Sequence, residues 1–533
     1  MLQTSYARRA IAVAPHGLAA QSAAAILREG GNAIEAMVAA AATVAVVYPH
    51  MNGIGGDAFW VLAAPDAAPF AIDACGPAAG AANVAWYRAK GLDAIPTRGP
   101  LAANTVAGTV SGWALALETS RARWGGRLPL SRLLEDAIHF AEAGVPVTAS
   151  QENNTRAKRA ELEAVPGFAQ RFLPGGKVPV TGALFAQPVL AATLRRLSQS
   201  GLDDFYRGEL AHAMAADLKA AGSPLAVEDL RQYSARIVPA LELRHRVGRL
   251  YNMQPPTQGV VSLAILGIAE RLGLAGMPAD GVDHVHALVE STKQAFLEIR
   301  NRYLSDPSRM PVAAQDLLAS ARLDALAAAV DMERALPWGQ RSDPGGTIWM
   351  GVIDAGGRAA SFIQSIYHEF GSGVVLPGSH VNWQNRGSSF SLDPNHLNAL
   401  APGMKPFHTL NPALARFDDG RLMVYGTMGG DGQPQTQAAV FSRYALFGQP
   451  LQQAITAPRW LLGRTWGSMS ESLKLESRFP QAVIDALRAR GHELEVLGAF
   501  EETMGHAGAL VRHPDGALEG ASDPRSDGAV AGF

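Results

Sequence analysis

Apolar residues recur at every third or fourth position through much of the first two thirds of the chain, a spacing typical of amphipathic helices. Two helices are predicted within residues 19–48, because residues 29–32 (EGGN) have the residue types of a helix end followed by an N-cap. From Thr109 to about Arg334 the chain is predicted to be mainly helical, with helices over residues 113–119, 128–143, 188–197, 211–221, 260–272 and 282–304.

The pattern changes from Thr347 onward, where short apolar runs separated by Gly and Asp predict strands. These runs are residues 348–354 (IWMGVID), 359–367 (AASFIQSIY) and 422–430 (LMVYGTMGG). Earlier strands are predicted from Phe59 and over residues 70–73, and later helices near residues 433–447 and 480–490. Since no low-complexity linker separates the two halves, we expect one intertwined globule with helices packed around sheets.

The composition narrows the possible partners. The 533 residues are 48% hydrophobic and 18% charged, which is ordinary for a soluble globular protein. The formal net charge is −2 and no run of Lys or Arg stands out, so nucleic acid is not an expected partner. The substrate is therefore expected to be a small molecule.

The chain start has no long apolar stretch of the kind that forms a secretory signal, so a cytoplasmic protein is expected. The most apolar segment, residues 36–48, is shorter than the ~20 residues of a membrane helix and is predicted to be a buried core helix. The single cysteine, Cys75, excludes an intramolecular disulfide and a cysteine-rich metal site. It also has no recognisable setting as a catalytic nucleophile.

Two glycine-rich segments are candidates for backbone-mediated binding. Residues 52–57 (NGIGGD) look like a dinucleotide-binding turn, but they follow a predicted helix rather than a strand, which argues against a cofactor site. Residues 426–432 (GTMGGDG) lie between a predicted strand and a predicted helix. Amide groups at such a turn can stabilise a developing oxyanion, although a plain tight turn would have the same residue types.

A third segment, residues 343–354 (DPGGTIWMGVID), places Gly345 and Gly346 directly before Thr347 and a predicted strand. A loop-to-strand junction is one interpretation, because Gly and Pro often precede strands. The other is a site where the chain cuts itself before the threonine. The new α-amino group, with an ordinary pKa of ~7.7–8.0, could then act as the base for the hydroxyl of Thr347.

The motifs, taken together, resemble the gamma-glutamyltransferase (glutathione hydrolase) family. The matching segments follow the family's order and approximate spacing, and they are GGNAIEAMVAAAATVAVVYPHMNGIGGDAFWVL, NMQPPTQG, RYLSDP, GGTIWMGVID, FGSGVV, LNPAL, TMGGDGQPQTQ and GASDPRSDG. The resemblance implies an α+β protein with the four-layer αββα core of N-terminal-nucleophile hydrolases. It implies a proenzyme that cleaves itself before Thr347 into fragments 1–346 and 347–533, which stay together as a heterodimer. It implies no metal and no organic cofactor.

The resemblance also assigns the residues expected to carry the chemistry. Thr347 corresponds to the nucleophile, and Ser365 to a supporting hydroxyl eighteen residues further on. Gly429 and Gly430 correspond to the two glycines of the oxyanion hole.

The residues expected to contact the substrate depart from the family pattern. The family's arginine for the substrate α-carboxylate falls near Ala82, where no charge is present. Tyr367, Arg386 and Ser389 stand in place of the family's Asn, Gln and Asp, and the pair His408-Thr409 stands in place of two serines. Without the acidic partner a glutamyl ammonium group would be poorly held, and the altered set resembles the branch that includes oxamate amidohydrolase.

We therefore expect an autoprocessed amidohydrolase that cleaves a small carboxylate-bearing amide. Arg386 is expected to bind the carboxylate, with a structural salt bridge as the alternative, and His408 either lines the pocket or is bonded within its loop. Other possible functions are a gamma-glutamyltransferase or glutathione hydrolase, a cephalosporin-acylase-like enzyme, and an uncleaved, catalytically silent binding protein. Whether the heterodimer pairs further stays open.

Overall fold

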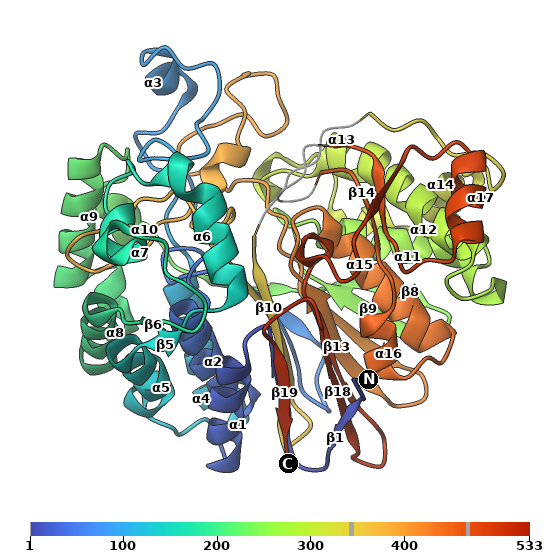
Figure 1. The fold of residues 1–533 in the computed structure, drawn as a ribbon, viewed down its shortest axis with the longest axis horizontal. Helices are drawn as coiled ribbons and strands as arrows, with labels where there is room; N and C mark the ends of the chain where they lie inside the picture. Colours follow the sequence, from blue (N-terminus) through green and yellow to red (C-terminus); the bar gives the residue numbers. More distant parts are fainter. Residues whose placement is uncertain (1, 340–345, 465–469) are drawn as a thin grey trace.

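The computed structural model describes residues 2–339, 346–464 and 470–533 (Figure 1). Two sheets of seven antiparallel strands form its centre. The first sheet consists of β1 (Ser5–Ala7), β18 (Leu518–Ser522), β17 (Ala507–Arg512), β13 (Leu422–Thr427), β12 (Ala413–Phe417), β9 (Gly248–Asn252) and β8 (Leu241–His245), in that order. The second consists of β19 (Ala529–Gly532), β2 (Ile11–Ala14), β10 (Ile348–Ile353), β11 (Ala359–Ser365), β3 (Asp57–Ala63), β4 (Phe70–Ala74) and β7 (Arg236–Pro239).

The two sheets pack face to face through alternate apolar side chains of their strands. Phe59, Trp349 and Ile363 of the second sheet share one buried cluster with Val424 and Leu510 of the first sheet. Side chains one position along each strand point to the opposite face, where they meet helices. Each sheet contains strands from before and from after residue 346, so the two parts of the chain are interleaved in the core.

Helices cover the outer face of each sheet, on either side of the sheets in Figure 1. The helices on the second sheet include α1 (Gly17–Arg28), α2 (Ala33–Val47), α4 (Thr109–Trp124), α5 (Leu130–Ala143), α8 (Pro188–Ser200) and α9 (Glu209–Ala221). Those on the first sheet include α11 (Gly259–Arg271), α12 (Val282–Ala295), α14 (Ser320–Ala328), α15 (Gly432–Phe441), α16 (Leu451–Thr456) and α17 (Gln481–Ala489). The remaining α-helices are α3 (Val84–Arg88), α6 (Ala149–Leu162), α7 (Phe168–Phe172), α10 (Val227–Gln232) and α13 (Asn301–Tyr303).

Helix α2 shows how the local sequence places an element in the core. Asn32 and Glu35 form a capping box, in which the Asn32 side chain accepts from the amide of Glu35 and the Glu35 carboxylate accepts from the amide of Asn32. Every residue of α2 is buried, which agrees with a helix that is apolar on all sides. The prediction of a buried core helix over residues 36–48 is confirmed. Within the described residues, no helix has both the length and the apolar content needed to cross a membrane.

The sequence interpretation missed several strands. In the region predicted to be mainly helical the longest of them are β7, β8 and β9, between residues 236 and 252. Strands β7 and β8 lie at sheet edges; β7 is mostly exposed, whereas β8 alternates between buried and more exposed residues. The predicted helices over 282–304 and 433–447 are present, but each passes through a π-helical turn, at Phe296–Arg300 and Ser442–Leu446. Small sheets of β14 (Trp460–Leu462), β15 (Leu473–Glu476) and β16 (Leu494–Leu497), and of β5 (Val145–Pro146) and β6 (Leu184–Phe185), complete the fold.

Candidate functional site

Thr347 lies immediately before β10, one of the central strands of the second sheet. Only 1% of the surface of Thr347 is exposed. Ile348 pairs with Gln364 of β11, so Ser365 lies beside Thr347 on the neighbouring strand. Ser365 in turn pairs with Asp57 at the start of β3. Three polar residues are therefore aligned across the ends of three adjacent strands, on the face that looks toward the first sheet.

The hydroxyl of Ser365 contacts the peptide bond before Thr347. Its Oγ donates a hydrogen bond to the carbonyl oxygen of Gly346 at 2.8 Å and accepts one from the amide of Tyr367 at 2.7 Å. Both groups are buried, which strengthens these interactions relative to water. Gly345, the other glycine of the predicted flexible step, lies outside the described residues.

The turn after β13 lies level with Thr347 across the gap between the sheets. A Cβ on Gly351 would contact Val424 at 3.2 Å, and a Cβ on Gly426 would meet Trp349 at 2.3 Å. Gly351 of β10 therefore faces Val424 of β13, and Trp349 faces Gly426. Two residues further along both strands, the same register places Thr347 opposite residue 428.

The next residues, Gly429 and Gly430, have φ angles of +120° and +54°, a backbone that favours glycine. Within the described part of the chain, neither of their amide groups has a recorded hydrogen-bond acceptor. We refer to Gly346, Thr347, Ser365, Gly429 and Gly430 as the nucleophile region.

The second set of predicted residues comes together around Arg386, which is 1% exposed. Its Nη2 donates to Thr409 Oγ1 at 3.0 Å, its Nη1 donates to the carbonyl oxygen of Phe407 at 3.2 Å, and its guanidinium lies 3.4 Å from the ring centre of Tyr367. Ser389 Oγ donates to the carbonyl oxygens of Arg386 and Phe407. We refer to Tyr367, Arg386, Ser389, His408 and Thr409 as the head-group region.

Tyr367 connects the two regions through an uncommon backbone conformation. Its φ is +80°, which is a costly conformation for a residue with a large side chain and is often found at functional sites. The amide of Tyr367 is bound by Ser365, while its ring supports Arg386. Ala82, near which the family's arginine is expected to fall, is a buried residue with no polar side chain.

His408 is bound by Asp57, a residue that the sequence interpretation did not select. His408 Nε2 and Asp57 Oδ2 are 3.2 Å apart, and both residues are fully enclosed. The other carboxylate oxygen of Asp57 accepts hydrogen bonds from the amides of Gly76 and Gly108 and from Gln384. Burial raises the pKa of Asp57 to about 7 despite these donors, and burial, followed by the nearby Arg386, holds the pKa of His408 well below its usual range.

Asp57 ends the NGIGGD segment, in which the glycines allow close packing of the backbone. A Cβ on Gly56 would lie 2.0 Å from the carbonyl oxygen of Ser365, and one on Gly55 would lie 2.3 Å from that of Asn382. The glycines are thus explained by contact with β11 and the 382–384 segment. The signal that could have found Asp57 was this motif, which places an acidic residue at the first position of a buried strand.

Gln258 is a second residue that the sequence interpretation passed over. Its side-chain Nε2 donates to the carbonyl oxygens of Thr409 and Gly430, each at 3.0 Å. It therefore ties the head-group region to the glycine turn, although it comes from the other side of residue 346. Gln258 belongs to the NMQPPTQG motif, but an isolated glutamine in a Pro-rich segment gives no direct signal of this role.

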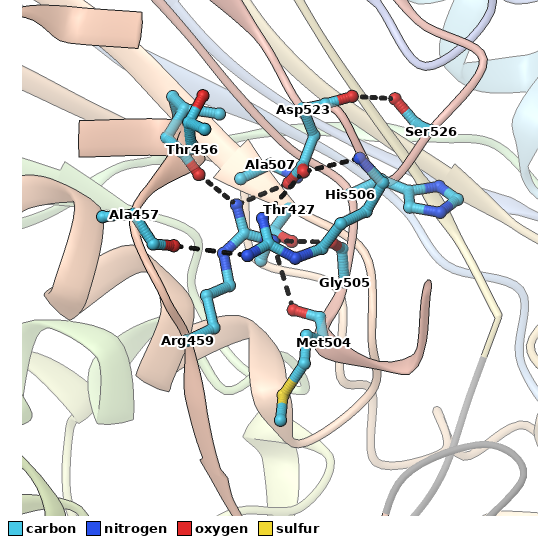
Figure 2. Close-up of polar contacts among 12 residues, drawn as sticks. Thr427, Thr456, Ala457, Arg459, Met504, Gly505, His506, Ala507, Asp523 and Ser526 are labelled. Atoms are coloured by element: carbon cyan, nitrogen blue, oxygen red, sulfur yellow. Dashed lines mark hydrogen bonds and ion pairs between the residues drawn. The ribbon is translucent and has the colours of Figure 1, made fainter. Parts of the chain in front are cut away.

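Figure 2 shows a buried ion pair between Arg459 and Asp523, which lies beside the segment that the glycine turn contacts. Arg459 Nη1 donates to the carbonyl oxygens of Met504 and Gly505 at 3.2 and 2.6 Å, and its Nη2 lies 2.5 Å from Asp523 Oδ2. The Cα of Gly505 lies 3.8 Å from the place where a Cβ on Gly429 would be. The ion pair thus fixes the segment against which the turn rests.

Two groups of side chains have the donor types and spacing of a metal site: Asp57, Cys75 and His408, and His286, Glu290 and His492. In the first group burial raises the pKa of the Cys75 thiol well above its usual range, and both Asp57 oxygens already accept hydrogen bonds. A protonated thiol is a weak metal ligand and a weak nucleophile. In the second group Glu290 pairs with Lys293 at 2.7 Å. Each group is better explained by its own hydrogen bonds.

Comparisons with known proteins agree with this geometry over nearly the whole chain. A family model described as gamma-glutamyltranspeptidase matches residues 19–533. The oxamate amidohydrolase proenzyme of Klebsiella pneumoniae is 58% identical over 533 residues, which cover 100% of each chain. The glutathione hydrolase-like YwrD proenzyme of Bacillus subtilis is 39% identical and covers 98% of each chain. The crystal structure of cephalosporin acylase from Bacillus halodurans superposes with a TM-score of 0.91 at 33% identity, covering 100% of this chain and 97% of that chain.

The fold, the threonine at the start of a central strand and these relatives define the class of protein, an amide hydrolase of the N-terminal-nucleophile type. The chain is therefore an enzyme rather than a silent binding protein. The chain belongs to the gamma-glutamyltranspeptidase family. The family resemblance inferred from the sequence motifs is confirmed.

Proposed function

We propose that this protein is a proenzyme that cleaves itself between Gly346 and Thr347 and then hydrolyses oxamate or a closely similar small carboxylate-bearing amide. The observation that carries the substrate is the 58% identity, over both full chains, to an oxamate amidohydrolase proenzyme. The arginine-centred head-group region supports it, because a planar guanidinium suits a small carboxylate. Loss of the family's acidic contact at Ser389 argues against a glutamyl ammonium group.

In the first step the Thr347 hydroxyl attacks the carbonyl carbon of Gly346. The hydrogen bond from Ser365 to the Gly346 oxygen draws electron density from that carbonyl and favours attack. The peptide C–N bond breaks, the threonine nitrogen takes up a proton, and an ester joins Gly346 to Thr347 Oγ. Water then hydrolyses the ester, which releases the carboxylate of Gly346 and leaves a free α-amino group on Thr347.

The product is a heterodimer of fragments 1–346 and 347–533, the second of which has 533 − 346 = 187 residues. The two fragments would not separate readily, since β10 and β11 of the smaller one lie between β2 and β3 of the larger one. In this proposal the four layers of helices and sheets are the αββα arrangement of N-terminal-nucleophile hydrolases.

In the second step Thr347 Oγ attacks the amide carbon of the substrate, and the α-amino group of the same residue accepts the hydroxyl proton. The amides of Gly429 and Gly430 stabilise the negative oxygen of the tetrahedral intermediate. The proton passes to the leaving nitrogen, so oxamate releases ammonia and leaves an oxalyl ester on Thr347. Water attacks the ester, and oxalate departs. We propose hydrolysis rather than transfer, which means that water, and not an amine, accepts the acyl group from Thr347.

The test is a panel of oxamate, a gamma-glutamyl anilide and a glutaryl cephalosporin, offered to matured enzyme with analysis of the products. We expect turnover of oxamate, with kcat/KM for gamma-glutamyl donors below the ordinary enzyme range of roughly 10⁴–10⁸ M⁻¹s⁻¹. Efficient hydrolysis of glutathione would contradict the substrate and leave the family assignment intact.

A further inference from the structure

Glu369 is a buried acid that the steps described above do not use. It belongs to the loop after β11, and only 3% of its surface is exposed. A Cβ on Gly346 would lie 3.2 Å from Glu369 Oε1, so this oxygen lies against the residue whose peptide bond is proposed to break. Among the residues that the structure describes, Oε1 has no hydrogen-bond partner. A buried carboxyl oxygen without a donor is costly, so stability alone does not explain it.

The loop fixes the place of this carboxyl group at a cost in backbone energy. Phe370, the next residue, has a φ of +61°, a costly conformation that is concentrated at functional sites. Its amide donates to the carbonyl oxygen of His50 at 2.7 Å. Arg98 Nη1 donates to the carbonyl oxygens of Glu369 and Gly371, the first at 2.7 Å. The backbone at Glu369 is therefore held by the segment after α2 and by the loop between α3 and α4.

The charged groups around the carboxyl group come from that same loop and from α6. Lys158 Nζ lies 4.0 Å from Glu369 Oε2, and Glu161 pairs with Arg98 at 2.7 Å and with Lys158 at 3.7 Å. His50 is neutral, because burial lowers its pKa to about 3. Burial raises the pKa of Glu369, and the charges of Arg98 and then Lys158 oppose that shift. A carboxylate with a raised pKa is a stronger base than an ordinary one.

Self-cleavage requires a base that Thr347 itself does not provide. In the mature protein the α-amino group of Thr347 accepts the hydroxyl proton, but before cleavage the same nitrogen is part of a peptide bond and is not basic. The Ser365 hydroxyl donates to the Gly346 oxygen, so it activates the carbonyl group rather than the nucleophile. Another group beside this peptide bond must therefore take the proton.

We propose that Glu369 is a catalytic residue of self-cleavage, whose carboxylate accepts the hydroxyl proton of Thr347, directly or through one water molecule, and passes it to the leaving nitrogen. The bond from Oγ to the Gly346 carbon forms as the proton leaves Oγ. When the C–N bond breaks, the proton moves from Glu369 to the threonine nitrogen, and Glu369 is a carboxylate again. The inference rests on the proposed function, because it concerns the same cleavage.

The first experiment follows full-length chains newly made by cell-free translation, with electrophoresis to measure the fraction cleaved against time. Glu369→Gln keeps the size of the side chain but removes the base, so its cleavage should slow by about 10²-fold or more. Glu118→Gln, at an exposed position on α4, is the control and should cleave at the original rate. Cleavage of Glu369→Gln at the rate of this control would overturn the proposal.

The second experiment dilutes the new chains into buffers of different pH. The cleavage rate of the unchanged protein should rise with pH and level off once Glu369 is ionised, and Glu369→Gln should lose this rise. Lys158→Met removes a cation that favours the carboxylate, so the midpoint of the rise should move upward by roughly 0.5–1 pH unit. A structural role for Glu369 would leave the midpoint in place. An unmoved midpoint in Lys158→Met would contradict the proposal even if Glu369→Gln fails to fold.

The outcomes for the unchanged protein separate this inference from the proposed function. If sequencing shows that the unchanged chain is never cleaved before Thr347, the proposed function and this inference are both wrong. If the unchanged chain is cleaved there and Glu369→Gln has the same rate and the same pH dependence, this inference alone is wrong. A slow Glu369→Gln together with a pH-dependent Glu369→Asp, which keeps a carboxyl group, would support both.

Discussion

The nucleophile region and the head-group region lie next to each other, but they are built from different parts of the fold. Thr347, Ser365 and the glycine turn stand at the ends of β10, β11 and β13, where strand pairing fixes their positions. Arg386 and Ser389 stand in a short 3-10 turn, and His408 and Thr409 in a loop before β12.

In the proposed function, the nucleophile region carries out the chemistry and the head-group region binds the substrate. The nucleophile region uses backbone groups and small hydroxyls, which tolerate little change because their places depend on strand register. The head-group region uses large polar side chains on loops, which can be exchanged without disturbing the sheets. On that proposal, the substrate contacts can change while the catalytic residues stay in place. Substitutions in the first region should therefore affect self-cleavage and turnover together, and those in the second should affect turnover alone.

The largest effect is expected for Thr347→Ala. Without the hydroxyl the protein should stay a single chain, and amide hydrolysis should fall by at least about 10³-fold. Thr347→Ser should still cleave, more slowly, because it keeps a hydroxyl. Denaturing electrophoresis should show two bands for the unchanged protein, and sequencing of the smaller one should begin Thr-Ile-Trp-Met. Active enzyme that runs as one full-length band would contradict self-cleavage at this bond.

The next largest effect is expected for Arg386. Arg386→Ala should cleave normally but lose ~30-fold or more in kcat/KM for oxamate, because a buried substrate charge without its partner costs about 2–5 kcal/mol. Arg386→Lys should lose almost as much, since an ammonium cannot reproduce the planar fork.

Arg121→Ala, at an exposed position, is the matched control and should change neither property. If cleaved Arg386→Ala has unchanged kinetics, Arg386 is a structural residue and the carboxylate is bound elsewhere.

A smaller effect is expected for Ser365→Ala. Loss of the hydrogen bond to the Gly346 oxygen should slow self-cleavage about 2–10-fold, because one neutral hydrogen bond contributes roughly 0.5–1.5 kcal/mol. The measurement is the fraction of precursor cleaved against time after purification. Ser365→Thr should restore most of the rate. Cleavage of Ser365→Ala at the original rate would show that this hydroxyl takes no part in maturation.

The smallest effect is expected for Asp57→Asn. Because the pKa of Asp57 is raised from 3.8 to about 7 in the folded protein, the folded state holds a proton that the unfolded state has lost between these values. Stability from this group is therefore greatest at acid pH, falls as pH rises toward 7, and is constant above. Asp57→Asn should show a Tm that falls less between pH 5 and pH 8, by about 1–3 °C. Asp66→Asn, at an exposed position, should keep the original slope. An unchanged slope in Asp57→Asn would mean that Asp57 stays ionised.

The sequence was most informative where a residue acts through its neighbours along the chain. The cap at Asn32 and the apolar run that follows specify α2 locally, and the strands around Trp349 and Ile363 were predicted from short apolar runs separated by Gly and Asp. Strand β7 was missed because it is a mostly exposed edge strand. Thr347 and the two glycines were selected because their motifs are contiguous.

Asp57 and Gln258 could not be selected in this way, because each acts on residues more than a hundred positions away along the chain. Burial in the folded chain raises the pKa of Asp57, against the opposing effect of hydrogen bonds from Gly76, Gly108 and Gln384. Burial and pairing are properties of the folded chain, and no spacing in the sequence encodes them directly.

The sequence by itself determined the family, and it predicted the threonine nucleophile and the replacement of the usual substrate contacts by Tyr367, Arg386 and His408. Those features depend on residue identity and on short spacing along the chain, which can be read from the sequence alone. Tertiary structure alone decided that Ser365 bonds the Gly346 carbonyl and that Asp57 holds His408. The physical reason is that register, desolvation and cavity shape arise only when distant segments pack together.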